Sequence, residues 1–349
     1  MFAHWTRRSI MAAGIGVAAS ACAKQEEAPA PAPLGPVLGG VTRISPALDA
    51  LIAADAQIEE LGTGYQWAEG PLWIASGQYL LFTDVPGNKI YKWSQAGGVE
   101  EFLSPSGFAG ADASHLREGG ANGLALEAAG TVLMADTGNR NISRLDLTTK
   151  QKTIVVEKYQ GKRFNSPNDV VVHSSGAIYF TDPPYGLQGM ADSPLRETPF
   201  QGVYRLGTDG ALALVDDTLA FPNGIAFSPD QSTLYVACSD GEKPQVVAYT
   251  LGANGLPSAS RQLFDSKPLQ AEDKPGNPDG LTVDTAGNLF VTGTGGVMVI
   301  SPQGELLGQI STGRQAANCK FGEDGHTLFI TCHEKLARIR TVTRGVGFA

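Results

Sequence analysis

The stretch Pro222-Asn223-Gly224-Ile225 decides the fold of this chain, because five related stretches occur along it. Each has a small residue or proline, a polar residue, usually a glycine, and then alternating apolar residues. The polar residues are 53, 46, 55, 56 and 39 positions apart, a mean of about 50. Strand-rich repeats of roughly 40–50 residues are typical of β-propellers. The other five stretches are Ala68-Glu69-Gly70-Pro71, Ala121-Asn122-Gly123-Leu124, Pro167-Asn168-Asp169-Val170, Pro278-Asp279-Gly280-Leu281 and Ala317-Asn318-Cys319-Lys320.

A second strand follows each copy after a turn, and it is rich in β-branched and aromatic residues, as half-buried strands are. We therefore predict an all-β protein, a six-bladed β-propeller. The segment around residues 57–61 is expected to pair into the last blade, which removes an open sheet edge. The six second strands are residues 80–84, 132–136, 178–182, 234–238, 289–293 and 328–332.

The N-terminus reads as an export signal over residues 1–21. Arg7-Arg8 precede a short apolar run that ends in small residues, and their context is like that of a twin-arginine signal. Two interpretations of Cys22 stay open: lipidation at a lipobox, or plain cleavage before an ordinary cysteine. We expect a location in the periplasm or cell envelope, with membrane contact only through a lipid on Cys22. Residues 22–46 read as an Ala/Pro-rich tether, and residues 47–349 as the propeller domain.

Composition excludes several classes of protein. The chain has 349 residues, 42% of them apolar, which is ample for a packed core, and its four cysteines are too few for a disulfide scaffold. A net charge of −9 argues against nucleic acid as a partner. A disulfide between Cys319 and Cys332 is one possibility, and three buried thiols including Cys238 are the other.

The repeated polar residue opens the strand nearest the propeller axis, so six equivalent side chains face one another. A single Asn-Gly or Asp-Gly is usually a turn, but folding does not require this residue type at all six positions. Crowded buried carboxylates need a positive ion among them. Calcium binds oxygen ligands, and Glu69 and Asp279 would neutralise it, while Asn168 and Asn223 would add amide oxygens. The five histidines lack ligand spacing and no Cys-x-x-Cys occurs, which disfavours a soft metal. We predict a central metal site for one divalent cation, Ca²⁺.

Several of these motifs resemble the senescence-marker-protein/gluconolactonase family, from about Leu48 to Arg340. They are Glu69-Gly70-Pro71, Ser166-Pro167-Asn168-Asp169, the run from Phe180 to Gly186, Pro222-Asn223-Gly224 and Asn277-Pro278-Asp279-Gly280. The resemblance implies a six-bladed propeller with one catalytic divalent ion, usually calcium. It also implies that Glu69, Asn223 and Asp279 are core ligands and that Asn168 is a fourth, weaker one.

The function expected from this resemblance is a calcium-dependent hydrolase that opens a sugar lactone, such as gluconolactone, to the aldonic acid. Its partner is the small-molecule lactone, and the resemblance assigns the general base to Asp279. Ser166 stands where animal members carry a substrate-binding arginine, so the same site acting on organophosphates or non-sugar lactones is an alternative. A non-catalytic, ligand-binding propeller of the envelope is another. The expected substrate-binding residues are Asn122, Asp169, Tyr185, His115, Asn318 and His333.

Overall fold

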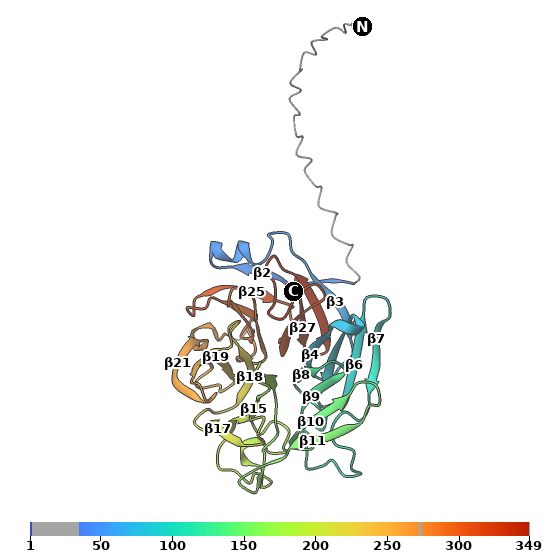
Figure 1. Ribbon diagram of the computed structural model, residues 1–349, viewed down its shortest axis with the longest axis vertical. Coiled ribbons are helices and arrows are strands. Elements are labelled where there is room, and N and C mark those ends of the chain that lie inside the picture. The colour runs from blue at the N-terminus through green and yellow to red at the C-terminus, as the bar shows by residue number, and fades with distance from the viewer. Residues whose placement is uncertain (2–34, 272–273, 349) are drawn as a thin grey trace. The chain divides into compact units, whose positions relative to one another are not determined.

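The six repeats fold into six antiparallel sheets around a common centre (Figure 1). The computed structural model describes residues 1, 35–271 and 274–348. The predicted export signal, Cys22 and the predicted tether up to residue 34 therefore lie outside the described residues, except for Met1. In the part of the chain that is described, no helix is long and apolar enough to cross a membrane.

Each sheet is one blade, and its strands follow one another from the centre outward. Blade 1 comprises β4 (Ala68–Ile74), β5 (Tyr79–Asp84), β6 (Lys89–Ser94) and β7 (Gly98–Leu103); blade 2 comprises β8 (Leu124–Ala128), β9 (Thr131–Asp136), β10 (Asn141–Asp146) and β11 (Lys152–Val156); blade 3 comprises β14 (Val170–Val172), β15 (Ile178–Asp182), β16 (Gly202–Leu206) and β17 (Leu212–Asp216). Blade 4 comprises β18 (Pro222–Phe227), β19 (Thr233–Cys238), β20 (Gln245–Leu251) and β21 (Pro257–Asp265); blade 5 comprises β22 (Leu281–Val283), β23 (Leu289–Gly293), β24 (Gly296–Ile300) and β25 (Leu306–Ser311); blade 6 comprises β26 (Asn318–Gly322), β27 (Thr327–Cys332) and β28 (Lys335–Arg340). Short elements lie between them: η1 (Pro46–Ala50), η2 (Ala75–Gly77), β12 (Lys158–Tyr159), β13 (Lys162–Arg163), η3 (Met190–Asp192) and η4 (Lys267–Leu269).

The ring is closed by β3 (Ile58–Thr63), which pairs with β28 and completes blade 6. The expectation for residues 57–61 is thus confirmed. Arg338 on β28 also forms an ion pair with Glu59 on β3, with 2.9 Å between Nε and Oε2. A strand that precedes blade 1 in the sequence is therefore held by the last strand of blade 6.

Two further strands lie where the sequence analysis placed the tether. β1 (Val37–Leu38) pairs with β3, and β2 (Gly40–Arg43) pairs with β25. The propeller thus begins about ten residues before the boundary predicted at residue 47. Composition alone did not show this, because both strands are short and are held by backbone hydrogen bonds to blade edges, not by an apolar pattern.

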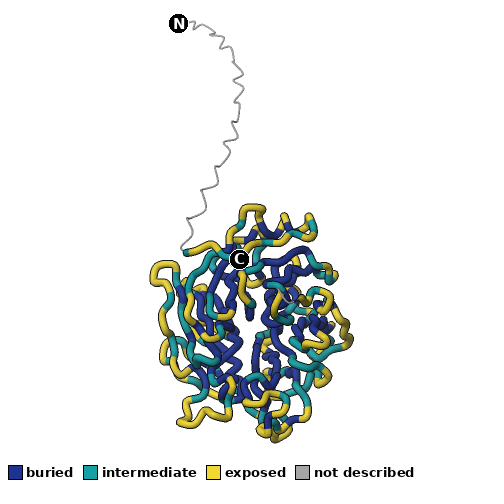
Figure 2. Tube along the Cα trace, turned by 180° about the vertical axis from the view of Figure 1, so that it is seen from behind, coloured by how far each residue is buried: buried dark blue, intermediate teal, exposed yellow. Residues whose placement is uncertain are grey.

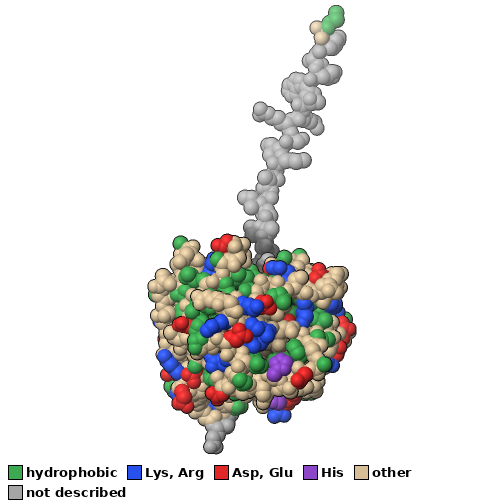
Figure 3. Space-filling view, turned by 90° about the horizontal axis from the view of Figure 1, so that it is seen from below, with side chains coloured by type: hydrophobic (Ala, Val, Ile, Leu, Met, Phe, Trp, Pro, Cys, Tyr) green, Lys and Arg blue, Asp and Glu red, His purple; other side chains and the backbone are tan. Residues whose placement is uncertain are grey.

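The hydrophobic core is divided into six clusters, each between two neighbouring blades. Leu81 of blade 1 and Met134 of blade 2 share one cluster, for example, and Tyr179 of blade 3 and Val236 of blade 4 share another. Figure 2 shows the consequence: buried chain surrounds the centre, whereas exposed chain lies at the turns around the rim. On the face seen in Figure 3, acidic and basic side chains are interspersed.

The cysteines of the described residues are buried free thiols: Cys238, Cys319 and Cys332. Cys319 on β26 lies opposite Ile330 in the strand register, not opposite Cys332. Burial raises the pKa of the Cys332 thiol to about 11, which makes it a poor nucleophile. Of the two possibilities left open above, the structure has the thiols and not the disulfide.

Neighbouring blades are joined near the centre by hydroxyl side chains at the end of the second strand. Each donates to a backbone carbonyl of the next blade's inner segment, and all the carbonyls lie at or next to the repeated polar residue. These inter-blade hydroxyl bonds are Thr83 Oγ1 to Asn122 O (3.1 Å), Thr137 Oγ1 to Pro167 O (2.6 Å), Thr181 Oγ1 to Asn223 O (2.7 Å), Ser239 Oγ to Pro278 O (2.6 Å) and Thr292 Oγ1 to Ala317 O (2.7 Å).

Replacement of Thr181 by Val tests these bonds, because valine keeps the shape and removes the hydroxyl. The Asn223 carbonyl would be left unpaired in a buried place, so we expect the free energy of unfolding to fall by about 1–3 kcal/mol. Urea denaturation measures it. Thr153→Val is the matched control, since Thr153 is exposed and its hydroxyl lies 3.5 Å from its acceptor. Equal losses in the two variants would show that the inter-blade bond contributes nothing.

Candidate active site

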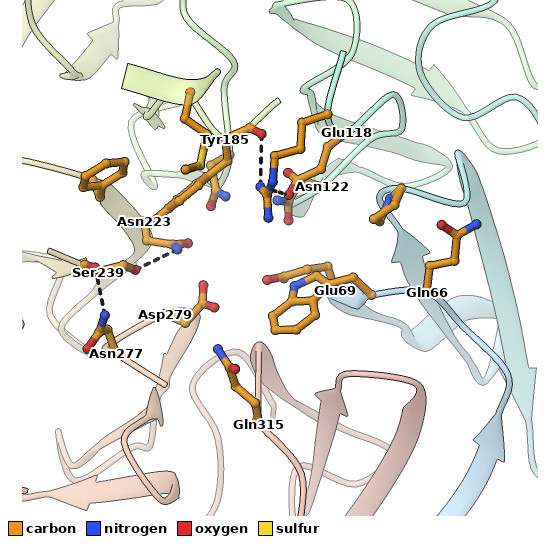
Figure 4. A pocket seen from close by; sticks show the side chains of 16 residues that line it. Gln66, Glu69, Glu118, Asn122, Tyr185, Asn223, Ser239, Asn277, Asp279 and Gln315 are labelled. Atoms are coloured by element: carbon orange, nitrogen blue, oxygen red, sulfur yellow. Dashed lines mark hydrogen bonds and ion pairs between the residues drawn. The ribbon is translucent and has the colours of Figure 1, made fainter. Parts of the chain in front are cut away.

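Five of the six repeated polar side chains line one cavity of about 550 Å³ at the centre of the ring. They are Glu69, Asn122, Asn168, Asn223 and Asp279, one from each of blades 1 to 5. Figure 4 shows Glu69, Asn223 and Asp279 directed toward a shared space. The convergence inferred from the repeat is therefore present in the structure.

The loops that carry these residues are fixed by aspartates at the ends of second strands. The carboxylate of Asp84 accepts hydrogen bonds from the backbone N–H groups of Gln66 and Trp67, each at 3.0 Å. In blade 3 the carboxylate of Asp182 accepts from Asn165 N and Ser166 N, each at 2.8 Å. These bonds hold the segments that lead into Glu69 and Asn168. The recurrent Thr-Asp pair thus joins the blades and positions the site.

Glycine follows the polar residue because adjacent inner strands approach closely. A Cβ on Gly224 would lie 2.3 Å from Asp279 O, and one on Gly70 would lie 2.1 Å from Asn122 O. Both distances are too short for any side chain, so Gly is needed at these positions to admit the neighbouring blade. The glycine of the repeat is therefore a packing requirement of the ring centre.

Glu69 and Asp279 form a buried pair of carboxylates, 2% and 9% exposed. Burial raises the pKa of Glu69 to about 7, and hydrogen bonds from Gly70 N and Asn318 only partly oppose this. Burial, and next the charge of Glu69, raises the pKa of Asp279 well above its ordinary value. Each carboxylate disfavours ionisation of the other. Oδ1 of Asp279 is buried without a hydrogen-bond partner.

Asparagine side chains also line this cavity and carry amide oxygens. Asn223 donates from Nδ2 to Ser239 Oγ at 2.9 Å, and Ser239 donates onward to Pro278 O. These two hydrogen bonds use the Nδ2 group of Asn223 and the hydroxyl of Ser239, so the amide oxygen of Asn223 is not bonded to Ser239. Oδ1 of Asn122 is buried and also lacks a partner.

These groups fit one hard divalent cation. Among the described residues, no group of three or more His, Cys, Asp or Glu side chains could hold a metal ion, so the anionic ligands here would be two carboxylates, Glu69 and Asp279. Two carboxylates, amide oxygens and an unpartnered buried Oδ1 form the oxygen-rich donor set that calcium accepts.

The other predicted residues divide into three groups. Asn122 and Tyr185 line the cavity. Asn318 and Asp169 do not: Asn318 donates from Nδ2 to Glu69 Oε2 at 3.0 Å, and Asp169 accepts from the backbone N–H groups of Val170 and Ile225. Both are structural supports next to the site, because their polar atoms are used within the ring.

His115 and His333 are corrections to the expected substrate-binding set, since both are exposed and neither lines the cavity. The ring of His115 packs edge-on against Phe108 at 5.3 Å, and that of His333 against Trp67 at 5.4 Å. Ser166 does not line the cavity either. It is fully buried, and its hydroxyl donates to Pro183 O and accepts from Gly186 N.

Sequence reasoning missed most of the cavity rim, because the rim comes from loops outside the repeat. Phe221 stacks on Tyr185, with 5.4 Å between ring centroids, and forms an aromatic wall. Ser239 directly follows the second strand of blade 4, as Thr137 and Thr294 follow those of blades 2 and 5, which was the only signal available for it. Glu118 had no repeat equivalent. The remaining unpredicted lining residues are Gln66, Trp67, Pro86, Arg117, Met190, Asn277 and Gln315.

Comparison with known proteins agrees with the fold and shows the family. Residues 67–334 match the family model described as the SMP-30/Gluconolactonase/LRE-like region. A gluconolactonase of Zymomonas mobilis is 44% identical over 316 residues, which are 89% of this chain and 88% of that protein. The solved structure of a gluconolactonase from Xanthomonas campestris is 33% identical, has a TM-score of 0.75 and covers 88% of this chain and 98% of its own. A regucalcin from Agrobacterium tumefaciens, described as a calcium-binding protein, is 19% identical with a TM-score of 0.65, covering 89% of this chain and 95% of its own. This chain thus belongs to the SMP-30/gluconolactonase/LRE-like family.

Proposed function

We propose that this protein is a lactonase that opens a sugar lactone, such as gluconolactone, to the aldonic acid with the help of one divalent cation, Ca²⁺. Lactone hydrolysis is supported by the 44% identity to the gluconolactonase of Zymomonas mobilis over most of both chains. The observation that carries the metal-dependent chemistry is the buried pair of Glu69 and Asp279, with Asp279 Oδ1 unpartnered beside it.

The cation would be held by Glu69, Asn168, Asn223 and Asp279. Its two positive charges balance the two carboxylates, which removes the repulsion that otherwise favours their protonation. The description of an Agrobacterium tumefaciens relative as calcium-binding supports the choice of Ca²⁺. When bound, the cation supplies Lewis-acid stabilisation for the charge that develops on the carbonyl oxygen of the lactone.

The chain's own residues carry out the remaining steps. Asp279 accepts a proton from the attacking water, and its burial raises the pKa of this carboxyl and so favours that role. Glu69 is kept in place by Gly70 N and Asn318 Nδ2, at 2.9 and 3.0 Å. The aromatic wall of Tyr185 and Phe221 shields one side of the cavity from water.

The location of the protein stays a prediction. An exported protein of the periplasm or cell envelope is what residues 1–21 indicate, and a lipid on Cys22 is one of the two interpretations left open.

Asp279→Asn removes one carboxylate while keeping the side chain's shape. We expect kcat on glucono-1,5-lactone to fall by about 1000-fold or more, because both a ligand charge and the base are lost. The rise in Tm on adding calcium should shrink as well, since binding to the folded state is what causes it. A pH-stat assay and thermal denaturation with and without calcium measure the two effects. Asp55→Asn, at an exposed site, is the control. Full turnover by Asp279→Asn would exclude the proposed mechanism.

Calcium affinity should depend on pH through Glu69. Its pKa in the folded, metal-free protein is raised to about 7, so the protonated form is favoured there and calcium must displace that proton. We therefore expect Kd for calcium to weaken about tenfold per pH unit below 7 for each proton released. Without metal, the free energy of unfolding should fall as pH rises from the ordinary carboxyl pKa through 7. Calorimetric titration at pH 6, 7 and 8 tests this, and an unchanged Kd would contradict it.

A further inference from the structure

We propose that Glu118 determines substrate specificity by accepting hydrogen bonds from the ring hydroxyl groups of a sugar lactone. This inference rests on the lactonase function proposed above and names the part of the substrate that is recognised. It concerns a residue outside the repeated polar positions, on the loop between β7 and β8.

Glu118 is a buried carboxylate at the cavity wall. Its side chain is 11% exposed, and it lines the same cavity as the predicted metal ligands. In Figure 4 it lies near Asn122 and Tyr185, on one side of the space that Glu69 and Asp279 face. Its charge contributes to the raised pKa of Asp279, after burial and Glu69, which places it within electrostatic range of the reacting centre.

One oxygen of Glu118 is already used, and the other is not. Arg117 Nη1 donates to Glu118 Oε1, and the same nitrogen donates to Tyr185 O at 3.2 Å. The backbone N–H of Arg117 also donates to Gly186 O, at 2.9 Å. Arg117 is thus a positioning residue that holds the carboxylate between two loops. None of the described residues donates a hydrogen bond to Oε2 of Glu118.

Glu118 differs from the predicted metal ligands in its position and in its hydrogen-bond partner. The four predicted ligands lie at the inner end of the blades, whereas Glu118 is on a connecting loop and is paired with a guanidinium. Burial is the main reason that the pKa of Glu118 is raised to about 7, and Arg117 opposes it. Hydrogen-bond donors of a bound substrate that reach Oε2 would replace the hydrogen bonds to water that this carboxylate loses on burial.

The substrate can supply those donors. A lactone rich in hydroxyl groups presents O–H donors around its ring, and hydrogen bonds to a charged acceptor are stronger than those between neutral groups. A lactone without hydroxyl groups would leave Oε2 desolvated and unpaired, which is unfavourable. Glu118 therefore selects for polyhydroxy lactones and against apolar ones, which favours the sugar lactone over the non-sugar alternative.

Glu118→Gln is the decisive variant, measured on glucono-1,5-lactone and on δ-valerolactone, which lacks ring hydroxyls. Arg117 would retain the amide oxygen, and the NH₂ group would then face the cavity where an acceptor is needed. We expect KM for gluconolactone to rise about tenfold or more with kcat within about threefold. Parameters for δ-valerolactone, and Kd for calcium, should stay within about threefold.

Other outcomes would overturn the inference. A loss confined to kcat would make Glu118 a proton-transfer group, and equal losses on both lactones would make it structural. Unchanged kinetics would exclude any role. Glu127→Gln, at a part-exposed glutamate paired with Arg144 away from the cavity, is the matched control. If Glu118→Gln does not fold, Glu118→Asp replaces it: an intermediate KM supports the proposal, and wild-type kinetics refute it. Failure of the wild type to open gluconolactone would instead count against the proposed function.

Discussion

The structure depends on one unfavourable interaction, the repulsion between two buried carboxylates at the centre of the ring. Rotational pseudo-symmetry brings Glu69 of blade 1 and the Asp279 segment of blade 5 to one place at the ring centre, where both are shielded from water. Among the described residues, neither carboxylate forms an ion pair with Lys or Arg, and Oδ1 of Asp279 has no hydrogen-bond partner. A folded protein tolerates such a pair when a proton or a cation lies among the oxygens. The requirement for a positive species is thus a property of the ring itself, and function is built on that requirement.

The ring holds this unfavourable centre through many small contacts. Apolar clusters lie between all six neighbouring pairs of blades, and hydroxyl side chains of five blades bond to the backbone that carries the next polar residue. A displacement of one inner strand would therefore disturb the neighbouring ligand as well as its own. This coupling explains why Thr or Ser at the end of the second strand recurs together with the polar residue of the following blade.

The repeat alone was enough to predict the six blades, the closing strand and the convergence of the inner polar residues. Each of these follows from period-2 strands at regular spacing. The repeat did not predict the roles of Asn318 and Asp169. Positions that are equivalent in the repeat differ in function once a side chain such as Asn318 bonds to its neighbour Glu69. His115 and His333 were wrongly placed at the cavity, since loop residues have no periodicity that fixes the direction of a ring. Glu118 and Phe221 were missed for the same reason.

The pairing of β3 with β28 has a consequence for biosynthesis. The strand that completes the circle, β3, is synthesised before blades 1 to 5, but its hydrogen-bonding partner β28 is synthesised after them. Contacts separated by so much of the sequence form slowly, because a very long loop must be closed first. The circular arrangement, and with it the central pair of carboxylates, is therefore complete only after β28 has been synthesised.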